Sequence, residues 1–299
     1  MIKKTLLTIG IILFSFMSYA QIALEHAQSA FSAGNYSDAA QLYEIIASTS
    51  TDQAEREKLY DMANKSREIP MLYEQADNAR KVNDYRLALE CYEKIISYNP
   101  NESVAKSQKD IMFAKYTNGH KYVDLGLSVK WATCNVGASS PEQSGKYYAW
   151  GEINVLSVYG SYYNKTWGRN IAGIQGNPQY DVARAKWGAT WKIPNQVEME
   201  ELIEKCTWIW TTQNGKNGYK VIGPNGNSIF LPAAGYRNDS AYDGKEPLRD
   251  VGVYGDYWTS TSYKKDDTCH AMWFWFANGG NGIDRAYRYY GCSIRPVIE

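Results

Sequence analysis

The sequence predicts an α+β protein in which a helical repeat region precedes a mixed α/β domain. Residues 21–118 contain no Trp and one Gly, whereas residues 119–299 contain ten Trp and 22 Gly. Apolar residues recur at helical spacing in the first stretch. Short strand-like runs, separated by Gly, Asn and Pro, dominate the second. We therefore expect two domains, residues 21–118 and 119–299.

The first twenty residues have the three parts of a secretory signal peptide. Lys3 and Lys4 precede an apolar run over residues 6–17, and small residues lead to a cleavage site after Ala20. A membrane anchor is the alternative, but the run is short for a hydrocarbon core of about 30 Å. We expect cleavage of residues 1–20 and no membrane span afterwards. The mature protein would then be periplasmic, on the outer cell surface or secreted.

The overall composition excludes several classes of protein. The chain has 32 basic and 32 acidic residues, so its formal net charge of zero argues against a nucleic-acid partner. Apolar residues make up 44% and charged residues 21%, which is ordinary globular usage rather than that of a disordered chain. The aromatic content of 14% is high and directs attention to aromatic surfaces.

Two apolar stripes with i, i+3, i+4, i+7 spacing indicate a helical repeat. They are Ala39, Leu42, Tyr43 and Ile46, and, 49 residues later, Ala88, Cys91, Tyr92 and Ile95. A turn and a Tyr precede each stripe, in Gly34-Asn35-Tyr36 and in Asp84-Tyr85. We predict a further helix over residues 52–68, a new helix opening at Pro70 and a closing helix over residues 102–116.

These residues resemble the tetratricopeptide repeat, although the period is 49 residues instead of 34. The resemblance implies stacked helix pairs with a concave surface that holds a protein partner. A helical spacer without a partner is the alternative. Cys91 lies on the second stripe and is expected to be an unpaired core residue.

The second half shows strand-like runs and one clear helix. The runs cover residues 122–125, 147–150, 228–231 and 272–276, and the last is apolar on both faces, as in a central strand. The helix follows Asn195, a suitable N-cap, and we expect Val197, Leu202 and Cys206 to face inward.

This half contains the residue runs His120–Ala138, Tyr147–Glu152, Leu231–Arg237, Tyr257–Thr261 and Gly291–Val297. Together these runs resemble the Fibrobacter succinogenes major paralogous domain. The family occurs on exported proteins of Bacteroidetes-type bacteria and has no agreed activity. Ile193–Glu198, Gly252–Trp258 and Gly291–Arg295 are similar in their order to landmarks of the formylglycine-generating and sulfatase-modifying proteins. This wider resemblance implies a C-type-lectin-like fold with a loop-built ligand face, although a fold does not fix a function.

The sequence contains no catalytic motif that would make the protein an enzyme. The formylglycine oxidases need reactive cysteines in the C-terminal segment, and residues 271–291 contain none. A binding protein is therefore the main prediction, and an enzyme of that group is the alternative. Glu198, Glu201 and Glu204 form a carboxylate cluster, which helix capping and solvation explain.

We expect no metal and no cofactor. Calcium-dependent lectins use Glu-Pro-Asn or Gln-Pro-Asp, whereas this chain has Glu246-Pro247-Leu248, and Leu248 offers no oxygen to calcium. Calcium on acidic loop residues is the alternative to solvated turns. Those residues are Asp239, Asp243, Asp250 and Asp256.

Four cysteines of the second half are disulfide candidates because export would allow oxidation. We favour Cys134–Cys206, followed by Cys269–Cys292, and isolated buried thiols are the alternative.

Aromatic and polar residues mark a candidate ligand face. Six tryptophans in strand-like or motif contexts are expected in the core, namely Trp131, Trp150, Trp191, Trp258, Trp273 and Trp275. The candidate ligand-binding residues are Tyr162, Tyr163, Trp167, Asn278, Asn281, Asp284, Arg285, Tyr287, Arg288 and Tyr289. Tyr, Asn and Arg supply flat contact area and adaptable hydrogen bonds. A solvated hairpin turn over residues 278–282 is the alternative.

The predicted function is that of an exported envelope or surface binding protein, without catalysis. Its helices would dock a protein partner, and its aromatic domain would bind a protein or a glycan. A structural surface protein without any ligand is a further alternative.

Overall fold

The computed structural model describes residues 19–239 and 247–299 and confirms an α+β protein. The chain divides into two compact units, one ending at Tyr116 and the other running from Thr117 to Glu299. The predicted signal peptide falls outside the described residues, except for positions 19 and 20. Within the described part, no helix has the length and apolar character needed to cross a membrane.

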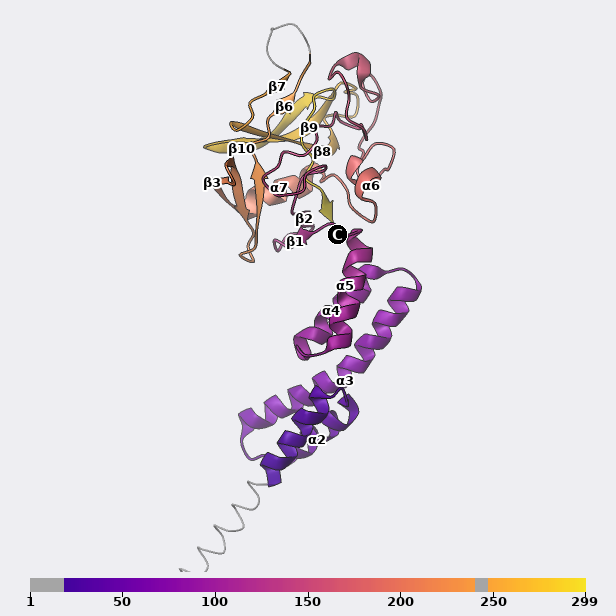
Figure 1. The fold of residues 1–299 in the computed structure, drawn as a ribbon, viewed down its shortest axis with the longest axis vertical. Coiled ribbons are helices and arrows are strands. Elements are labelled where there is room, and N and C mark those ends of the chain that lie inside the picture. The colour runs from indigo at the N-terminus through magenta and orange to yellow at the C-terminus, as the bar shows by residue number, and fades with distance from the viewer. Residues whose placement is uncertain (1–18, 240–246) are drawn as a thin grey trace, which may run out of the picture. The chain divides into compact units, whose positions relative to one another are not determined.

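The N-terminal unit consists of helices joined by short turns (Figure 1). A helix over residues 19–32 precedes α2 (Tyr36–Thr49), α3 (Gln53–Lys81), α4 (Tyr85–Tyr98) and α5 (Ser103–Thr117). The predicted closing helix, 102–116, is therefore confirmed to within one residue.

The turns before α2 and α4 repeat the same backbone device. Gly34 and Asn83, 49 residues apart, both adopt a left-handed conformation, with φ of 83° and 60°. Glycine and asparagine tolerate this region best, so each turn reverses the chain at the predicted place.

Helix α3 runs unbroken through Pro70, so the predicted new helix at that residue is wrong. Proline lacks the N–H that would bond to the carbonyl of Ser66. Buried residues before and after it, including Ile69 and Leu72, nevertheless hold the helix in place. One end of α3 packs on α2 and the other on α4, as Figure 1 shows. The extra length of the repeat is thus the first part of a shared helix.

The predicted apolar stripes form the core of this unit. Ala39, Tyr43 and Ile46 of the first stripe are buried, while Leu42 is half-buried. All four residues of the second stripe are buried, and Cys91 is a free core thiol as predicted.

Small antiparallel sheets build the C-terminal unit (Figure 1). One meander consists of β3 (Thr207–Gln213), β4 (Lys216–Ile222) and β5 (Ser228–Pro232), in the order β3-β4-β5. A second consists of β8 (Tyr254–Ser262), β9 (His270–Ala277) and β10 (Gly280–Tyr287), in the order β10-β9-β8. The prediction that residues 272–276 form a central strand is confirmed.

Shorter elements complete the unit. Strands β1 (Tyr122–Val123), β2 (Lys130–Ala132) and β11 (Val297–Ile298) form a sheet in which β2 pairs with both neighbours, and β6 (Tyr236–Arg237) pairs with β7 (Leu248–Arg249). The remaining helical segments are η1 (Ser161–Tyr163), α6 (Val182–Trp187) and α7 (Gln196–Lys205).

Helix α7 begins after Asn195 as predicted, although Val197 faces the solvent instead of the core. The side chain of Asn195 accepts a hydrogen bond from the Glu198 N–H, and that of Glu198 accepts one from the Asn195 N–H, which forms a capping box. Leu202 is fully buried and Cys206 packs at the edge of the core. Val197 is 70% exposed, so its predicted inward position is wrong.

Residues 147–150 do not form the predicted strand. Tyr148 makes only an isolated bridge to Cys292, and the N–H of Trp150 donates to the carbonyl of Arg288. The pattern of burial explains the error. Tyr148, Ala149 and Trp150 are consecutive and all buried, so the segment is an internal connection without the alternation of a half-exposed strand.

Both predicted disulfides are absent, because all five cysteines are free thiols. Cys292 is fully buried beside Tyr148, whereas Cys269 is half-buried next to Thr268. Cys206 ends α7 at the edge of the core, and Cys134 follows β2. The structure therefore agrees with the alternative of isolated thiols.

Candidate functional site

The outer face of β9 carries two large aromatic side chains. Phe274 and Phe276 point into the core, whereas Trp273 and Trp275 alternate with them and are only half-buried. The prediction that these two tryptophans belong to the core is therefore wrong. The other four tryptophans predicted there are buried, namely Trp131, Trp150, Trp191 and Trp258.

The strand register sets distinct neighbours around each of these indoles. Asp256 of β8 and Gly282 of β10 lie opposite Trp275 on its two sides, and Asp284 of β10 lies opposite Trp273. Opposite residues of an antiparallel pair have Cβ atoms about 5 Å apart. A carboxylate thus flanks Trp275 on one side, while the missing side chain of Gly282 leaves its other side open.

The β6–β7 pair supplies a second aromatic wall. Gly235, with φ of 62°, lets the chain before β6 approach β7 so closely that a Cβ there would lie 1.9 Å from the Arg249 carbonyl oxygen. Its N–H donates to the carbonyl of Tyr254 at 2.7 Å. This approach brings Tyr236 to 5.9 Å from Trp273, measured between ring centroids.

These elements enclose a pocket of about 330 Å³, which we call the aromatic–carboxylate pocket. Its lining consists of four aromatic and three acidic residues, with no Lys, Arg or His among the described residues that line it. The lining residues are Tyr236, Asp250, Tyr254, Asp256, Trp273, Trp275 and Asp284.

Asp256 is the most unusual residue of the pocket. Its side chain is almost fully enclosed, at 2% exposed, and within the described part of the chain its Oδ2 has no hydrogen-bond partner. Burial, followed by the nearby charge of Asp250, raises the pKa of Asp256 to about 7. Buried carboxyl groups are normally hydrogen-bonded, so an unpartnered one in a pocket is a ready acceptor for a ligand.

A chain of contacting rings connects the pocket to the predicted ligand face. Tyr290 lies 5.3 Å from Tyr236 and 5.2 Å from Tyr289, and Tyr289 lies 5.1 Å from Trp167. Tyr287 stacks on Tyr289 with centroids 5.3 Å apart. The structure therefore brings Trp167 together with Tyr287 and Tyr289, from which it is distant in sequence.

Other predicted ligand residues lie elsewhere. Tyr162, 91% exposed, and Tyr163 contact each other in η1 rather than Trp167. Asn278 lies in the β9–β10 turn. Asn281 and Arg285 pair with Phe276 and Met272, so strand alternation puts them on the face opposite Trp273 and Trp275.

Residues 278–290 are not a loop throughout, because residues 280–287 form β10. Of the predicted ligand residues on this strand, Asp284 faces the pocket, and Tyr287 stacks on His270 at 4.5 Å.

Arg288 is a structural residue, so its predicted ligand contact is wrong. Its guanidinium is fully buried over the Trp150 ring, at 4.5 Å from the centroid. It donates to the carbonyls of Thr166 and Arg169 at 3.1 and 2.8 Å. It also donates to the carbonyls of Asp267 and His270, both at 3.0 Å. Arg288 thereby holds the segment that carries Trp167 beside the end of β10.

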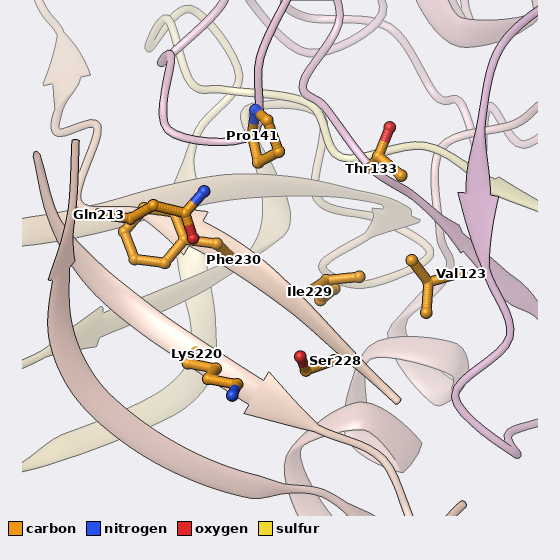
Figure 2. A pocket seen from close by; sticks show the side chains of 8 residues that line it. All are labelled: Val123, Thr133, Pro141, Gln213, Lys220, Ser228, Ile229 and Phe230. Atoms are coloured by element: carbon orange, nitrogen blue, oxygen red, sulfur yellow. The ribbon is translucent and has the colours of Figure 1, made fainter. Parts of the chain in front are cut away.

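A second cavity, of about 350 Å³, lies over β4 and β5 (Figure 2). Its lining mixes apolar side chains with hydroxyl and amide groups and one lysine. The residues are Val123, Thr133, Pro141, Gln213, Lys220, Ser228, Ile229 and Phe230. None of them presents a buried, unpartnered polar atom among the described residues, so this cavity is the weaker site.

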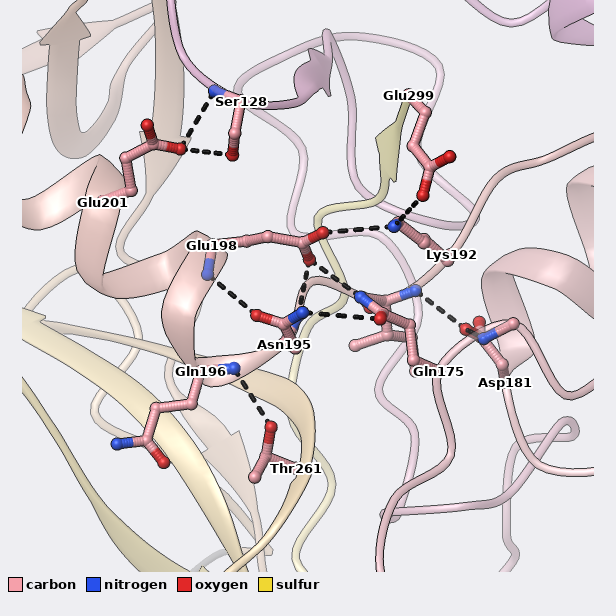
Figure 3. Close-up of polar contacts among 12 residues, drawn as sticks. Ser128, Gln175, Asp181, Lys192, Asn195, Gln196, Glu198, Glu201, Thr261 and Glu299 are labelled. Atoms are coloured by element: carbon pink, nitrogen blue, oxygen red, sulfur yellow. Dashed lines mark hydrogen bonds and ion pairs between the residues drawn. The ribbon is translucent and has the colours of Figure 1, made fainter.

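The polar cluster at the start of α7 explains the predicted carboxylate group in structural terms (Figure 3). Glu198 completes the capping box and pairs with Lys192 at 3.1 Å, and Lys192 also pairs with Glu299. Glu201 accepts hydrogen bonds from Ser128. Glu198 and Glu201 are thus engaged and hold α7 in place, whereas Glu204, the third member of the predicted cluster, is exposed.

The acidic loop residues do not assemble into a metal site in the described part of the chain. Asp239 accepts hydrogen bonds from the Tyr159 N–H and from Arg237. Asp243 lies outside the described residues. Asp250 and Asp256 both line the aromatic–carboxylate pocket.

Of the residues that line this pocket, only Asp284 was predicted as a ligand-binding residue, although the sequence carries one further signal. The run Trp273-Phe274-Trp275-Phe276 alternates two kinds of aromatic residue. Tryptophan is large and carries a polar N–H, so it is less often fully buried than phenylalanine. An alternation of Trp with Phe therefore favours Trp on the outer face.

Residues 192–297 match the family described as Domain of unknown function (DUF8237). The match covers about a third of the chain and includes every residue of the aromatic–carboxylate pocket. Trp167 and η1 lie outside it. No curated protein and no solved structure matches the chain.

Proposed function

We propose that this protein is a non-catalytic binding protein whose C-terminal unit holds its ligand in the aromatic–carboxylate pocket. One observation carries the proposal: the Asp256 carboxyl, whose Oδ2 has no hydrogen-bond partner among the described residues, is buried against Trp275 inside a pocket lined by aromatic rings. Aromatic faces provide apolar contact area, while a few polar groups fix the orientation of a ligand. A glycan or a protein side chain meets both requirements.

The ring chain from Tyr290 to Trp167 supports an extended contact surface. A ligand larger than the pocket would continue over Tyr289 and Tyr287, both predicted as ligand residues. Arg288 fixes this surface in advance, which lowers the ordering cost of binding.

We further propose the C-type-lectin-like fold of the Fibrobacter-type domain for this unit. The first and the last of the segments that carry the resemblance, near the beginning and the end of this unit in the sequence, pack against each other in the structure. Trp131 pairs with Val297, and Arg295 donates to the Asn135 side chain at 2.7 Å. Arg295 also donates to the carbonyls of Ala132 and Thr133. Closure of the opening motif on the closing motif is consistent with a domain of that kind.

An enzyme of the formylglycine-generating group is the alternative. Cys292 is fully buried, and burial raises its pKa well above the ordinary value, which disfavours the reactive thiolate. Loss of turnover on substitution of Cys269 or Cys292 would favour the enzyme. A protein that binds its ligand without turnover supports our proposal.

For the helical unit we propose a tetratricopeptide-like docking role. A cavity of about 610 Å³ over α3 and the start of α4 carries the exposed apolar residues Met71 and Val82 beside Glu74 and Asp84. Apolar contacts rimmed by carboxylates suit a partner with basic and apolar side chains. A double substitution, Met71→Glu with Val82→Glu, should preserve the helical circular dichroism and abolish a partner contact mapped by cross-linking.

We propose export on the basis of the first twenty residues. N-terminal sequencing of the protein recovered from its native cell should begin at Gln21. A chain that retains residue 1 would contradict cleavage.

The binding proposal is tested with the full chain on a glycan array, with and without calcium, and by tryptophan fluorescence. A matched pair of variants locates the site. A Cβ at Gly282 would lie 3.4 Å from the Trp275 Nε1, whereas one at Gly280 meets nothing within 4 Å. We expect Gly282→Leu to weaken binding at least tenfold and Gly280→Leu to leave it unchanged. Equal affinities of both variants for a bound ligand would contradict this pocket. A complete absence of ligands would favour a purely structural protein.

A further inference from the structure

We propose that the aromatic–carboxylate pocket recognises an organic ammonium group, presented either by a small amine or by a lysine side chain. This inference rests on the proposed binding function and specifies the ligand chemistry of the same pocket. The observations that carry it are the charge of the lining, the arrangement of its rings and the state of Asp256.

The lining is one-sided in charge. Asp250, Asp256 and Asp284 contribute carboxyl groups, and no basic side chain lines the pocket within the described residues. The guanidinium of Arg249 does not line the pocket, and it acts on Tyr236 through its charge and a side-chain hydrogen bond. The attraction between opposite charges is stronger in a partly desolvated site than in water. A cation therefore gains binding free energy from these carboxylates that a neutral ligand does not.

The rings around these carboxyl groups suit a cation as well. Indole and phenol faces attract ammonium groups, and tryptophan is the strongest of them. Two tryptophans and two tyrosines line a single pocket, with Tyr236 near Trp273 and Tyr254 at 6.5 Å from Trp275. Aromatic cages of this composition are a common way to bind alkylated ammonium groups.

A metal ion fits the pocket less well than an organic cation. The three carboxyl groups are distributed around the rings instead of converging, and no group of three or more potential ligands was found among the described residues. A hard metal ion needs several oxygen atoms at short distance. An ammonium group needs only one or two acceptors, together with apolar contact for its carbon atoms.

Asp256 supplies the specific acceptor. Its Oδ2 is buried and has no partner in the part of the chain that the structure describes. An ammonium N–H could donate a hydrogen bond to it, and a quaternary ammonium could compensate its charge. Bound positive charge favours the ionised carboxylate, so binding must be coupled to the titration of Asp256. Because the pKa of Asp256 is about 7 without a ligand, affinity should rise as the pH increases through neutrality.

The tyrosine and cysteine side chains that interact with Asp256 do not titrate in this interval. Tyr147, Tyr236, Tyr257 and Cys292 interact with it, and burial raises the pKa of each. These side chains stay protonated between pH 5.5 and 8.5. Asp250 acts on Asp256 by its negative charge.

The test uses the full chain and calorimetric titration with three matched pairs of probes. Tetramethylammonium is compared with neopentyl alcohol, and glucosamine with glucose. Nα-acetyl-lysine methylamide, which keeps its ε-ammonium group, is compared with N-acetyl-norleucine methylamide. We expect the cationic member of at least one pair to bind tenfold or more tightly than its neutral partner. The second and third pairs distinguish an amino sugar from a lysine side chain as the source.

The pH series isolates Asp256. Tetramethylammonium carries a fixed charge, so its affinity should increase about tenfold from pH 5.5 to 8.5 in the wild-type chain. Asp256→Asn should remove this pH dependence. Asp284→Asn changes an exposed pocket residue, so it should weaken binding but leave the pH dependence of the affinity in place. Trp275→Phe should weaken every cationic probe and leave the pH dependence intact, which guards against a fault specific to the Asp256 variant.

The outcomes separate this inference from the binding function itself. Equal affinity for charged and neutral probes, or a pH dependence that survives in Asp256→Asn, would overturn the ammonium assignment. If none of the probes binds while a neutral glycan does, and Gly282→Leu blocks that glycan, the inference fails and the binding function stands.

Discussion

Asp256 lies directly opposite Trp275 in the β8–β9 ladder, so a carboxyl group is buried against the outer face of an indole. The other buried carboxyl groups among the described residues are compensated by hydrogen bonds or ion pairs. That of Asp181, for example, accepts hydrogen bonds from the N–H groups of Gly176, Ala183, Arg184 and Ile193. Asp256 Oδ2 has no such partner among the described residues, which marks it as the acceptor that a ligand would complete.

Asp256→Asn should stabilise the ligand-free protein at alkaline pH. The pKa of Asp256 is about 7 in the folded state and near 4 when unfolded, so the folded state binds more protons between these values. The stabilising contribution of Asp256 is fully present below pH 4 and is lost as the pH rises through 7. We expect the variant to gain roughly 2–4 kcal/mol in free energy of unfolding at pH 8.5, and far less at pH 4.

Urea unfolding across this pH range measures the effect. Asp284→Asn is the control, because exposed substitutions usually change stability by less than about 0.5 kcal/mol. A gain for Asp256→Asn that is the same at pH 4 and 8.5 would show that its titration is not the cause.

Arg288→Met should destabilise the C-terminal unit by roughly 3 kcal/mol or more. The substitution leaves four carbonyl groups without their buried donor, and those groups carry the desolvation cost. Arg285, three residues earlier, is exposed, and Arg285→Met should change little. Urea unfolding compares the two, and near-ultraviolet circular dichroism should report the released Trp167 only in the first. Equal stabilities would refute a structural role for Arg288.

Pro70→Ala should stabilise the helical unit by roughly 1–3 kcal/mol. Pro70 is exposed within a continuous helix, and alanine restores the missing N–H while keeping a high helix propensity. Thermal unfolding followed at 222 nm measures the change. A loss of stability would instead show that the helix needs its proline, as a kinked or divided pair of helices would.

Five thiols should titrate per chain when the protein is unfolded without reductant. The structure leaves every cysteine free, and two of them, Cys91 and Cys292, are buried. In the folded protein these two should react slowest with a thiol reagent, since burial also raises their pKa. A count of three thiols in the unfolded chain would show one disulfide, and a count of one would show two. Peptide mapping would then identify the paired cysteines.

Local sequence was sufficient for the elements that depend on local chemistry. The stripe through Cys91 and Ile95, the cap at Asn195 and the turn at Gly34 each follow from a spacing or a backbone preference. Such signals act within about one turn of helix or one reversal of the chain. Pro70 was misjudged because packing on α2 and α4 outweighs its local preference for a helix start.

The division into a helical region and an aromatic sheet region follows from the order of residues alone, and so does the place of β9 as a central strand. Which face of β9 meets the core depends on three-dimensional packing, because Trp and Phe are both apolar and alternation does not say which of the two faces is covered. Packing of Phe274 and Phe276 in the core turned Trp273 and Trp275 outward. Cross-strand register and the β6–β7 pair then gathered Asp256, Asp284 and Tyr236 around them, since pairing between distant strands depends on the whole fold rather than on any local run of residues.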